Sequence, residues 1–209
     1  MRTLAILPVK SFPQAKQRLS SGLAPQLRRQ LAEAMLYDVL SALSETAVDE
    51  IIVVTADEPP ARLAREHGAL VLSDEEQGHN AAATLGVDEA VRSGAKRVLL
   101  VPGDCPALDP DEVNRLLARR AGARSVIIVP DRHGTGTNAL LIRPPDALAP
   151  SFGPGSCQRH VRLAQSAGVA HEVVEIPSLA LDIDTPEDLA ALSSLPEQGL
   201  RSHDLLLRC

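Results

Sequence analysis

The sequence predicts an α/β protein with a single domain, in which a mostly parallel, Rossmann-like sheet carries helices on both faces. Apolar runs of strand length alternate with helical patterns along most of the chain. Such alternation is typical of parallel sheets, whose right-handed crossovers place helices on both faces. The length of 209 residues and the apolar content of 44% are sufficient for one core. Because only 1% of the residues are aromatic, Leu, Val, Ile and Ala must fill that core.

The individual elements follow from residue spacing and from helix-start signals. Apolar residues recur at spacings of three and four over residues 25–43, which predicts an amphipathic helix, and Pro25 suits its first turn. Thr185, Pro186 and Asp188 are typical of an N-cap, a first helical position and a side chain that reaches back to the cap. In chain order we expect strands over 4–9, 51–54, 69–72, 98–101, 125–129, 138–142 and 170–174, and helices over 25–43, 60–67, 80–92, 110–120, within 155–168 and over 185–192.

Residues 1–192 form the predicted domain, and residues 193–209 form a C-terminal tail. The tail is partly polar, which is compatible with mobility. Its apolar run at 205–207 could instead pack against a partner chain, so a homodimer is compatible with the sequence. The stretch at 144–155 is rich in Pro and Gly and indicates a surface loop rather than a domain boundary.

Composition argues against several classes of partner. The net charge is -6 and aromatic residues are scarce, which disfavours nucleic-acid binding through basic patches or stacking rings. No apolar run approaches the roughly 20 residues of a membrane span, and the opening apolar run is too short for a signal peptide. The three cysteines, Cys105, Cys157 and Cys209, are scattered and do not suggest a disulfide framework. A reducing, cytoplasmic setting is therefore expected, with small molecules as ligands.

Two apolar runs, at 97–104 and 179–186, are of strand type and end in carboxylates. Ligands of open α/β sheets bind at the carboxyl ends of the strands. Asp104 and Asp184 delivered there could hold a divalent cation, which usually brings phosphates. Asp182 lies on the same side of an extended segment as Asp184, so it is the alternative ligand. Without a cation, either carboxylate could simply stabilise a turn.

The loop after the first strand carries Lys10, Lys16 and Arg18 ahead of the first helix. Loops at this position commonly bind phosphates, because backbone N–H groups and cations converge there. The loop has no glycine before Gly22, so phosphate binding would depend on the three cations. The alternative is that they are ordinary solvated surface charges.

Two further segments could contact a ligand. Gly78 permits a close turn, and Asn80 could either cap the helix that follows or hydrogen-bond a base or ribose. Asp131 to Asn138 form a flexible, donor-rich loop, and Gly155 and Ser156 begin a helix whose N-terminus favours a small anion. A plain loop with Ser156 as N-cap is the alternative. His160 on that helix is more often a packed or exposed histidine than a catalyst.

These motifs together resemble the 2-phospho-L-lactate / phosphoenolpyruvate guanylyltransferases, which act in biosynthesis of the deazaflavin coenzyme F-420. The resemblance covers residues 3–192, and its specific part is the pair Gly134-Thr135-Gly136-Thr137 and Phe152-Gly153-Pro154-Gly155-Ser156. Its other parts are Leu7-Pro8-Val9-Lys10, Lys16-Gln17-Arg18-Leu19, Gly78-His79-Asn80, Val101-Pro102-Gly103-Asp104-Cys105-Pro106 and Asp182-Ile183-Asp184-Thr185-Pro186.

The resemblance implies a nucleotidyltransferase fold of the glycosyltransferase-A type, with GTP as donor, Mg²⁺ as cofactor and a phosphorylated three-carbon acid as acceptor. It implies metal ligation by Asp104 and Asp184, catalytic roles for these two and for Lys10 and Lys16, and acceptor contacts at Thr137 or Asn138, Gly153 and Ser156. Asn138 stands where the family often has a further Thr. The expected nucleotide contacts are Leu7, Pro8, Val9, Lys10, Lys16, Arg18, Gly78, Asn80 and Asp104.

Two other functions compete with this interpretation. One is nucleotide transfer to a sugar phosphate or to molybdopterin, and the missing glycine-rich loop after the first strand counts against it. The other is a non-catalytic GTP-binding regulatory protein. A sensor has little need for two metal carboxylates, so the pair of acidic segments favours an enzyme.

Overall fold

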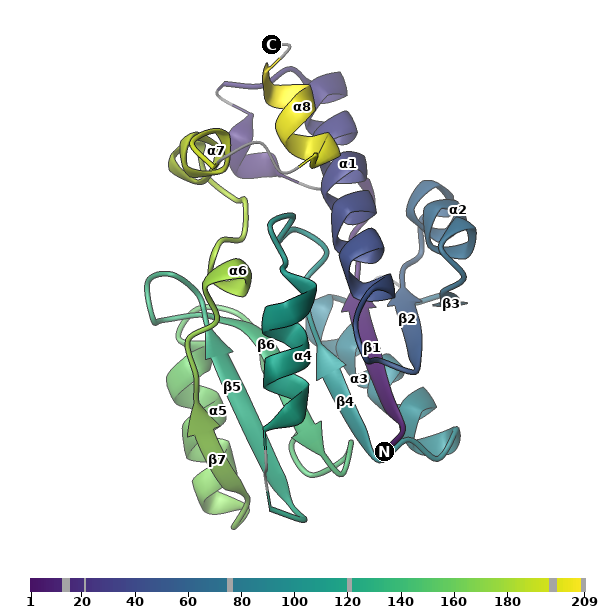
Figure 1. Cartoon of the computed structure of the whole chain (residues 1–209), viewed down its shortest axis with the longest axis vertical. Coiled ribbons are helices and arrows are strands. Elements are labelled where there is room, and N and C mark those ends of the chain that lie inside the picture. Colours follow the sequence, from purple (N-terminus) through teal and green to yellow (C-terminus); the bar gives the residue numbers. More distant parts are fainter. Residues whose placement is uncertain (13–15, 21, 75–76, 120–121, 196–198, 208–209) are drawn as a thin grey trace.

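The protein is built around one seven-stranded sheet, as the computed structural model in Figure 1 shows. The structure describes the chain except for residues 13–15, 21, 75–76, 120–121, 196–198 and 208–209. The strand order is β3-β2-β1-β4-β6-β5-β7. The strands are β1 (Thr3–Pro8), β2 (Glu50–Val54), β3 (Leu70–Leu72), β4 (Arg97–Leu100), β5 (Ser125–Pro130), β6 (Thr137–Arg143) and β7 (Ala170–Val173).

Six strands run in the same direction, and β6 is antiparallel to its neighbours β4 and β5. The mostly parallel sheet predicted from the sequence is confirmed. The reversal of β6 has a consequence for the site. It brings the first residues of β6 to the edge of the sheet at which the parallel strands end. Residues from the start of one strand and from the ends of others therefore meet at one edge.

Helices cover both faces of the sheet, as predicted. Side chains of β1 alternate between the faces, so Ala5 and Leu7 pack under α1, α2 and α4, while Leu4 and Ile6 pack under α3 and α5. Figure 1 shows α1 and α4 in front of the sheet. The helices are α1 (Pro25–Ser44), α2 (Glu58–Glu66), α3 (His79–Arg92), α4 (Pro110–Ala118), α5 (Ser156–Ser166), α6 (Pro177–Ala180), α7 (Pro186–Ser193) and α8 (Arg201–Leu207), with a 3-10 helix η2 (Gln17–Leu19).

The second acidic segment is not a strand end, contrary to our prediction. Residues 177–180 form the short helix α6, in which Leu179 is fully buried. The backbone from Leu181 to Asp184 then runs beside the turn that follows β4, where the Ile183 N–H donates to the Asp104 carbonyl at 3.1 Å. This contact brings the two acidic segments together without a strand.

The predicted starts of three helices have different outcomes. Thr185 caps α7 in a reciprocal capping box with Asp188, as predicted. Asn80 does not cap α3, because Gly78 occupies the N-cap position with φ 102°. Ser156 is likewise the first residue of α5 rather than its cap, and Gly155 caps this helix in a left-handed conformation, with φ 68°. Glycine adopts both of these backbone conformations without the penalty that a Cβ would impose.

The tail contains α8, which the sequence analysis missed and which packs along α1 (Figure 1). The buried carboxylate of Asp38 on α1 accepts hydrogen bonds from the backbone N–H groups of Arg201 and Ser202 at 2.9 Å each. Leu205 and Leu206 are partly buried against α1 and α7 of their own chain, whereas Leu207 is exposed.

Among the described helices, none is long and apolar enough to cross a membrane. Cys209 and Arg120, the expected end of one helix, lie outside the described residues.

Gly86 lets α3 approach β1 closely, and we predict that replacing it destabilises the fold. A Cβ at this position would lie 2.4 Å from Cγ2 of Ile6. Gly86→Ala should therefore lower the free energy of unfolding by about 1–3 kcal/mol, because the well-packed core must shift to admit the methyl group. Urea denaturation measures the change. Gly22→Ala is the matched control, since nothing lies within 4 Å of its Cβ. An equal effect of the two substitutions would contradict the close-packing argument.

Candidate active site

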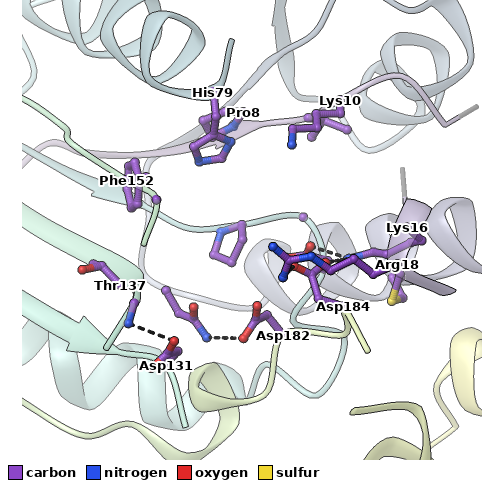
Figure 2. A pocket seen from close by; sticks show the side chains of 18 of the residues that line it. Pro8, Lys10, Lys16, Arg18, His79, Asp131, Thr137, Phe152, Asp182 and Asp184 are labelled. Carbon is purple, nitrogen blue, oxygen red and sulfur yellow. Dashed lines mark hydrogen bonds and ion pairs between the residues drawn. The ribbon is translucent and has the colours of Figure 1, made fainter. Parts of the chain in front are cut away.

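A cavity of about 590 Å³ opens at the edge of the sheet where β1 and β4 end and β6 begins. In Figure 2, Pro8, Lys10 and His79 lie along one side and Thr137, Asp131 and Asp182 along the other, with Lys16, Arg18 and Asp184 together at one end. Of the residues predicted from the sequence, the lining includes Pro8, Val9, Lys10, Lys16, Arg18, Asp104, Thr137, Asn138, Gly153, Ser156, Asp182 and Asp184.

Three predicted nucleotide contacts lie outside this lining. The side chain of Leu7 is fully buried in the core under α1. Gly78 lines a smaller adjoining hollow of about 110 Å³, which shares Pro8, Val9, Lys10 and His79 with the main cavity. The side-chain amide of Asn80 pairs with the backbone of Phe152, accepting from its N–H at 2.7 Å and donating to its carbonyl at 3.2 Å. Asn80 thus joins α3 to the loop before α5.

The ammonium group of Lys16 joins the two predicted metal ligands. It lies 2.5 Å from an oxygen of Asp104 and 3.1 Å from an oxygen of Asp184, and only 5% of the side chain is exposed. Burial alone would lower the pKa of Lys16, but the two carboxylates raise it above its ordinary value of 10.5, so the group carries a charge. The exposed guanidinium of Arg18 lies 3.8 Å from Asp184.

The backbone of Lys16 is unusual for a non-glycine residue. Its φ of 57° and ψ of 35° lie in the left-handed region, immediately before η2. Such strain persists where surrounding contacts compensate for it, and it occurs often at functional sites. Here the ion pairs with Asp104 and Asp184 supply the compensating contacts.

Asp182 is held by Asn138 at the start of β6. The Asn138 side-chain amide donates to Asp182 at 3.1 Å and to the Leu179 carbonyl at 2.7 Å. Burial and the nearby Asp104 raise the pKa of Asp182 above its ordinary value. Asp182 therefore holds its negative charge less readily than an exposed carboxylate. The Asn138 amide is engaged in fixing this segment.

Asp188 fixes the backbone at Asp184. One of its oxygens accepts from the N–H groups of Asp184, at 3.0 Å, and Thr185, at 2.7 Å. The other pairs with the guanidinium of Arg132 at 2.6 Å, and Arg132 also donates its backbone N–H to the Ala180 carbonyl. Although burial alone would raise the pKa of Asp188, these hydrogen bonds and Arg132 lower it. The loop after β5 and the acidic segment are thus connected.

The loop between β5 and β6 is organised by Asp131. Its carboxylate accepts from the backbone N–H groups of His133, Thr135 and Gly136, at 2.9 to 3.1 Å. A Cβ on Gly136 would lie 2.5 Å from that carboxylate, which explains the glycine. Thr137, the next residue, bonds through its hydroxyl to Nδ1 of His160 at 3.0 Å. His160 is fully buried, which is the packed one of the two non-catalytic states, packed or exposed, that the sequence analysis favoured.

The start of α5 is less open to an anion than predicted. The Ser156 N–H donates to the Gly153 carbonyl at 3.0 Å, and the Cys157 N–H donates to the Thr135 carbonyl at 3.2 Å. The Ser156 side chain is almost fully buried at the cavity wall. The first N–H groups of α5 are therefore used to join this helix to its neighbouring loops.

The sequence analysis gave no site role to His79, Asp131 or Phe152, all of which line the cavity. His79 and Phe152 make an edge-on ring contact with centroids 5.1 Å apart, and burial lowers the pKa of His79. His79 and Phe152 lie inside motifs that were recognised, next to Asn80 and Gly153. Asp131 is the first residue of the donor-rich loop, and that position is the signal that could have identified it.

The residues present fit a magnesium ion that is shared with phosphates. Asp104 and Asp184 both contact the Lys16 ammonium, so their oxygens converge on one cation position. Magnesium is usually bound by one or two carboxylates together with water and substrate phosphates, rather than by an all-protein cage. Within the described residues, no group of three or more His, Cys, Asp or Glu side chains is arranged to hold a metal ion.

This fold is that of the nucleotidyltransferases of the glycosyltransferase-A type. The solved structure of a nucleotidyl transferase from Methanothermobacter thermautotrophicus superimposes with a TM-score of 0.64, covers 99% of this chain and 98% of its own, and is 20% identical. At this identity the likeness supports the fold alone.

The chain belongs to the family described as "Guanylyl transferase CofC like", whose profile matches residues 3–206. A phosphoenolpyruvate guanylyltransferase from Conexibacter woesei is 54% identical over 93% of this chain and 89% of its own. A 2-phospho-L-lactate guanylyltransferase from Methanothermobacter thermautotrophicus is 35% identical over 92% of this chain and 84% of its own. The family expected from the sequence motifs is confirmed.

We predict that Asp188 stabilises the fold in a pH-dependent manner. Its pKa lies below the ordinary 3.8 in the folded protein, so its contribution is complete above about pH 4 and is lost as the pH falls through the folded value. Asp188→Ala should lower the free energy of unfolding by about 1–3 kcal/mol at pH 7 and by less at pH 2.5.

Urea denaturation at the two pH values tests this. The control is Asp109→Ala, which removes the exposed N-cap of α4 and its hydrogen bonds from Asp111 and Glu112; among the described residues Asp109 forms no ion pair with an arginine. We expect that control to cost about 1 kcal/mol at pH 7. A loss for Asp188→Ala that is as large at pH 2.5 as at pH 7 would disprove the charge-based explanation.

Proposed function

We propose that this protein transfers GMP from GTP to a phosphorylated three-carbon acid, phosphoenolpyruvate or 2-phospho-L-lactate, and releases pyrophosphate, as a step of coenzyme F-420 biosynthesis. The single observation that carries the proposal is the convergence of Asp104 and Asp184 on one cation position at the end of the cavity. Membership of the guanylyl transferase family supports the choice of nucleotide. We expect the protein to act in the cytoplasm, where both substrates are available.

On the donor side, the triphosphate would lie along the loop after β1. Lys10 and Arg18 are exposed and can reach a polyanion, and Lys16 already contacts the two carboxylates. Together the three cations would offset the charge of the triphosphate. The hollow bounded by Lys10, Gly78 and His79 is where we expect the nucleoside to extend.

On the acceptor side, the phospho-acid would lie against the start of β6 and the loop before α5. Thr137, Gly153 and Ser156 line this wall of the cavity. Asn138 lines it too, and its contacts indicate that it contributes by holding Asp182. The acceptor would thus enter opposite Lys10, with its phosphate directed toward Asp104 and Asp184.

In the reaction, a phosphate oxygen of the acceptor forms a bond to the α-phosphorus of GTP. The bond between the α-phosphorus and the oxygen that bridges it to the β-phosphorus breaks. The electron pair leaves with pyrophosphate. The acceptor phosphate is already ionised near pH 7, so no general base is required. Charge repulsion between the two anions is the main barrier, and Lys10, Lys16 and Arg18 reduce it. Magnesium bound by Asp104 and Asp184 would neutralise further phosphate charge.

Specific features disfavour the two competing functions. The loop after β1 lacks the glycine-rich signature expected for transfer to sugar phosphates. A regulatory GTP-binding protein would not need two carboxylates directed at one cation position beside the cavity.

The first test is a screen of acceptors. With GTP and Mg²⁺, purified protein should release pyrophosphate in the presence of phosphoenolpyruvate or 2-phospho-L-lactate, and mass spectrometry should detect the GMP adduct. ATP, CTP and UTP should be poorer donors, and 3-phosphoglycerate and sugar phosphates serve as comparison acceptors. Chelation of divalent cations should abolish the signal. Adduct formation only with a sugar phosphate would replace this proposal with the first competing function.

The second test removes a carboxylate. Asp104→Ala should retain its fold and lose more than about a hundredfold in turnover, because the metal ion that would neutralise the phosphates loses a carboxylate ligand. Asp88→Ala, an exposed carboxylate on α3, is the control and should keep normal turnover. Circular dichroism establishes that both variants fold. Near-normal pyrophosphate release by Asp104→Ala would refute the metal role.

A further inference from the structure

His160 on α5 is fully buried, and both of its ring nitrogens are hydrogen-bonded. Nε2 lies 2.9 Å from the backbone nitrogen of Ser151, and Nδ1 lies 3.0 Å from the hydroxyl oxygen of Thr137. A backbone N–H can only donate, so Nε2 must be the acceptor. In a neutral imidazole the single ring hydrogen is then on Nδ1, which donates to Thr137.

The neutral state of the ring follows from its surroundings. Burial, together with the charge of the neighbouring Arg159, lowers the pKa of His160 to about 4. The tautomer is therefore fixed throughout the physiological pH range.

The ring is also fixed in position. Arg159 holds the loop that contacts it, donating to the carbonyl oxygens of Ser151 and Pro154 at 2.8 and 2.9 Å. Phe152 packs edge-on against the imidazole, with centroids 5.5 Å apart. These contacts keep Nδ1 directed at the start of β6.

This bond affects the hydroxyl of Thr137, a residue that lines the cavity. Because its oxygen accepts the Nδ1 hydrogen, the hydroxyl's own hydrogen must point to a different partner. A threonine without this neighbour could use its hydroxyl as either donor or acceptor. Next to His160 the hydroxyl hydrogen is directed away from the ring and is available as a donor, which suits a carboxylate or phosphate oxygen.

We propose that His160 is a positioning residue that orients the Thr137 hydroxyl as a hydrogen-bond donor to an anionic oxygen of the acceptor substrate. This inference rests on the proposed function and deepens it. The expected effect is on the acceptor, because His160 lines neither the main cavity nor the adjoining hollow and reaches the cavity through Thr137, on the wall proposed for the acceptor.

Two substitutions of His160 distinguish the roles of its two hydrogen bonds, one from Ser151 and one to Thr137. Gln at position 160 can place its carbonyl oxygen near the site of Nε2, so His160→Gln keeps an acceptor for Ser151 but loses the donor to Thr137. Asn can place its NH₂ group near the site of Nδ1, so His160→Asn keeps that donor. We expect His160→Gln to raise the KM for the phospho-acid about tenfold or more, with the KM for GTP within about twofold of the wild type. His160→Asn should raise the acceptor KM by less than about threefold.

A double-mutant cycle tests whether His160 acts through Thr137. Thr137→Val should also raise the acceptor KM, and adding His160→Gln to it should change the KM by less than about twofold. His67→Gln, at a partly buried histidine packed against Tyr37, is the control and should leave both KM values unchanged. Thermal unfolding is measured for every variant.

Three results would overturn the inference. These are an equal rise of the KM for GTP and for the acceptor, equal effects of His160→Gln and His160→Asn, or effects of His160→Gln and Thr137→Val that multiply in the double variant. An active wild type with such results leaves the proposed function standing. A wild type that forms no GMP adduct with any three-carbon acid overturns the proposed function and this inference together.

Discussion

The buried ammonium group of Lys16 lies between the carboxylates of Asp104 and Asp184, and the end of the sheet is arranged around this contact. Asp182 adds a third carboxyl group nearby, so without a cation the negative charges of the three carboxylates would repel one another. The backbone of Lys16 adopts a left-handed conformation where it supplies that charge. The hydrogen bond from Ile183 to Asp104 and the capping box at Asp188 hold the two acidic segments in place. In the proposed reaction, a magnesium ion held by Asp104 and Asp184 would compete with Lys16 for the same oxygens.

Local signals predicted most of the fold. Leucine spacing identified α1, and Thr185 with Asp188 identified the start of α7, because these features depend on neighbours within one or two helical turns. The direction of β6 and the helix α6 escaped prediction. An apolar run has the same composition in either strand direction, and the run around Leu179 is too short for its periodicity to separate a strand from a helix. Long-range pairing decided both.

The site residues also divide into those that local sequence signals identify and those that depend on long-range contacts. Asp104, Asp184 and Lys16 could be identified because charged groups next to apolar runs are visible along the chain. The partners of Asn80 and His160 could not. Asn80 bonds to Phe152, 72 residues away, and His160 bonds to Thr137, 23 residues before it. A polar residue at the start or on the buried side of a helix has the same local appearance whether it caps, packs or positions a ligand group. Only the folded arrangement distinguishes these roles.

The attachment of α8 to Asp38 has a practical consequence for handling the chain. Asp38 is only 5% exposed, and its oxygens accept from the backbone of Arg201 and Ser202 and from the Ser202 hydroxyl. Arg201 also covers the Tyr37 ring. A recombinant version that stops before residue 201 would leave this carboxylate without its donors beside newly bared leucines. Purification tags are therefore better joined to the amino terminus, and limited digestion that releases the last helix would be expected to promote aggregation.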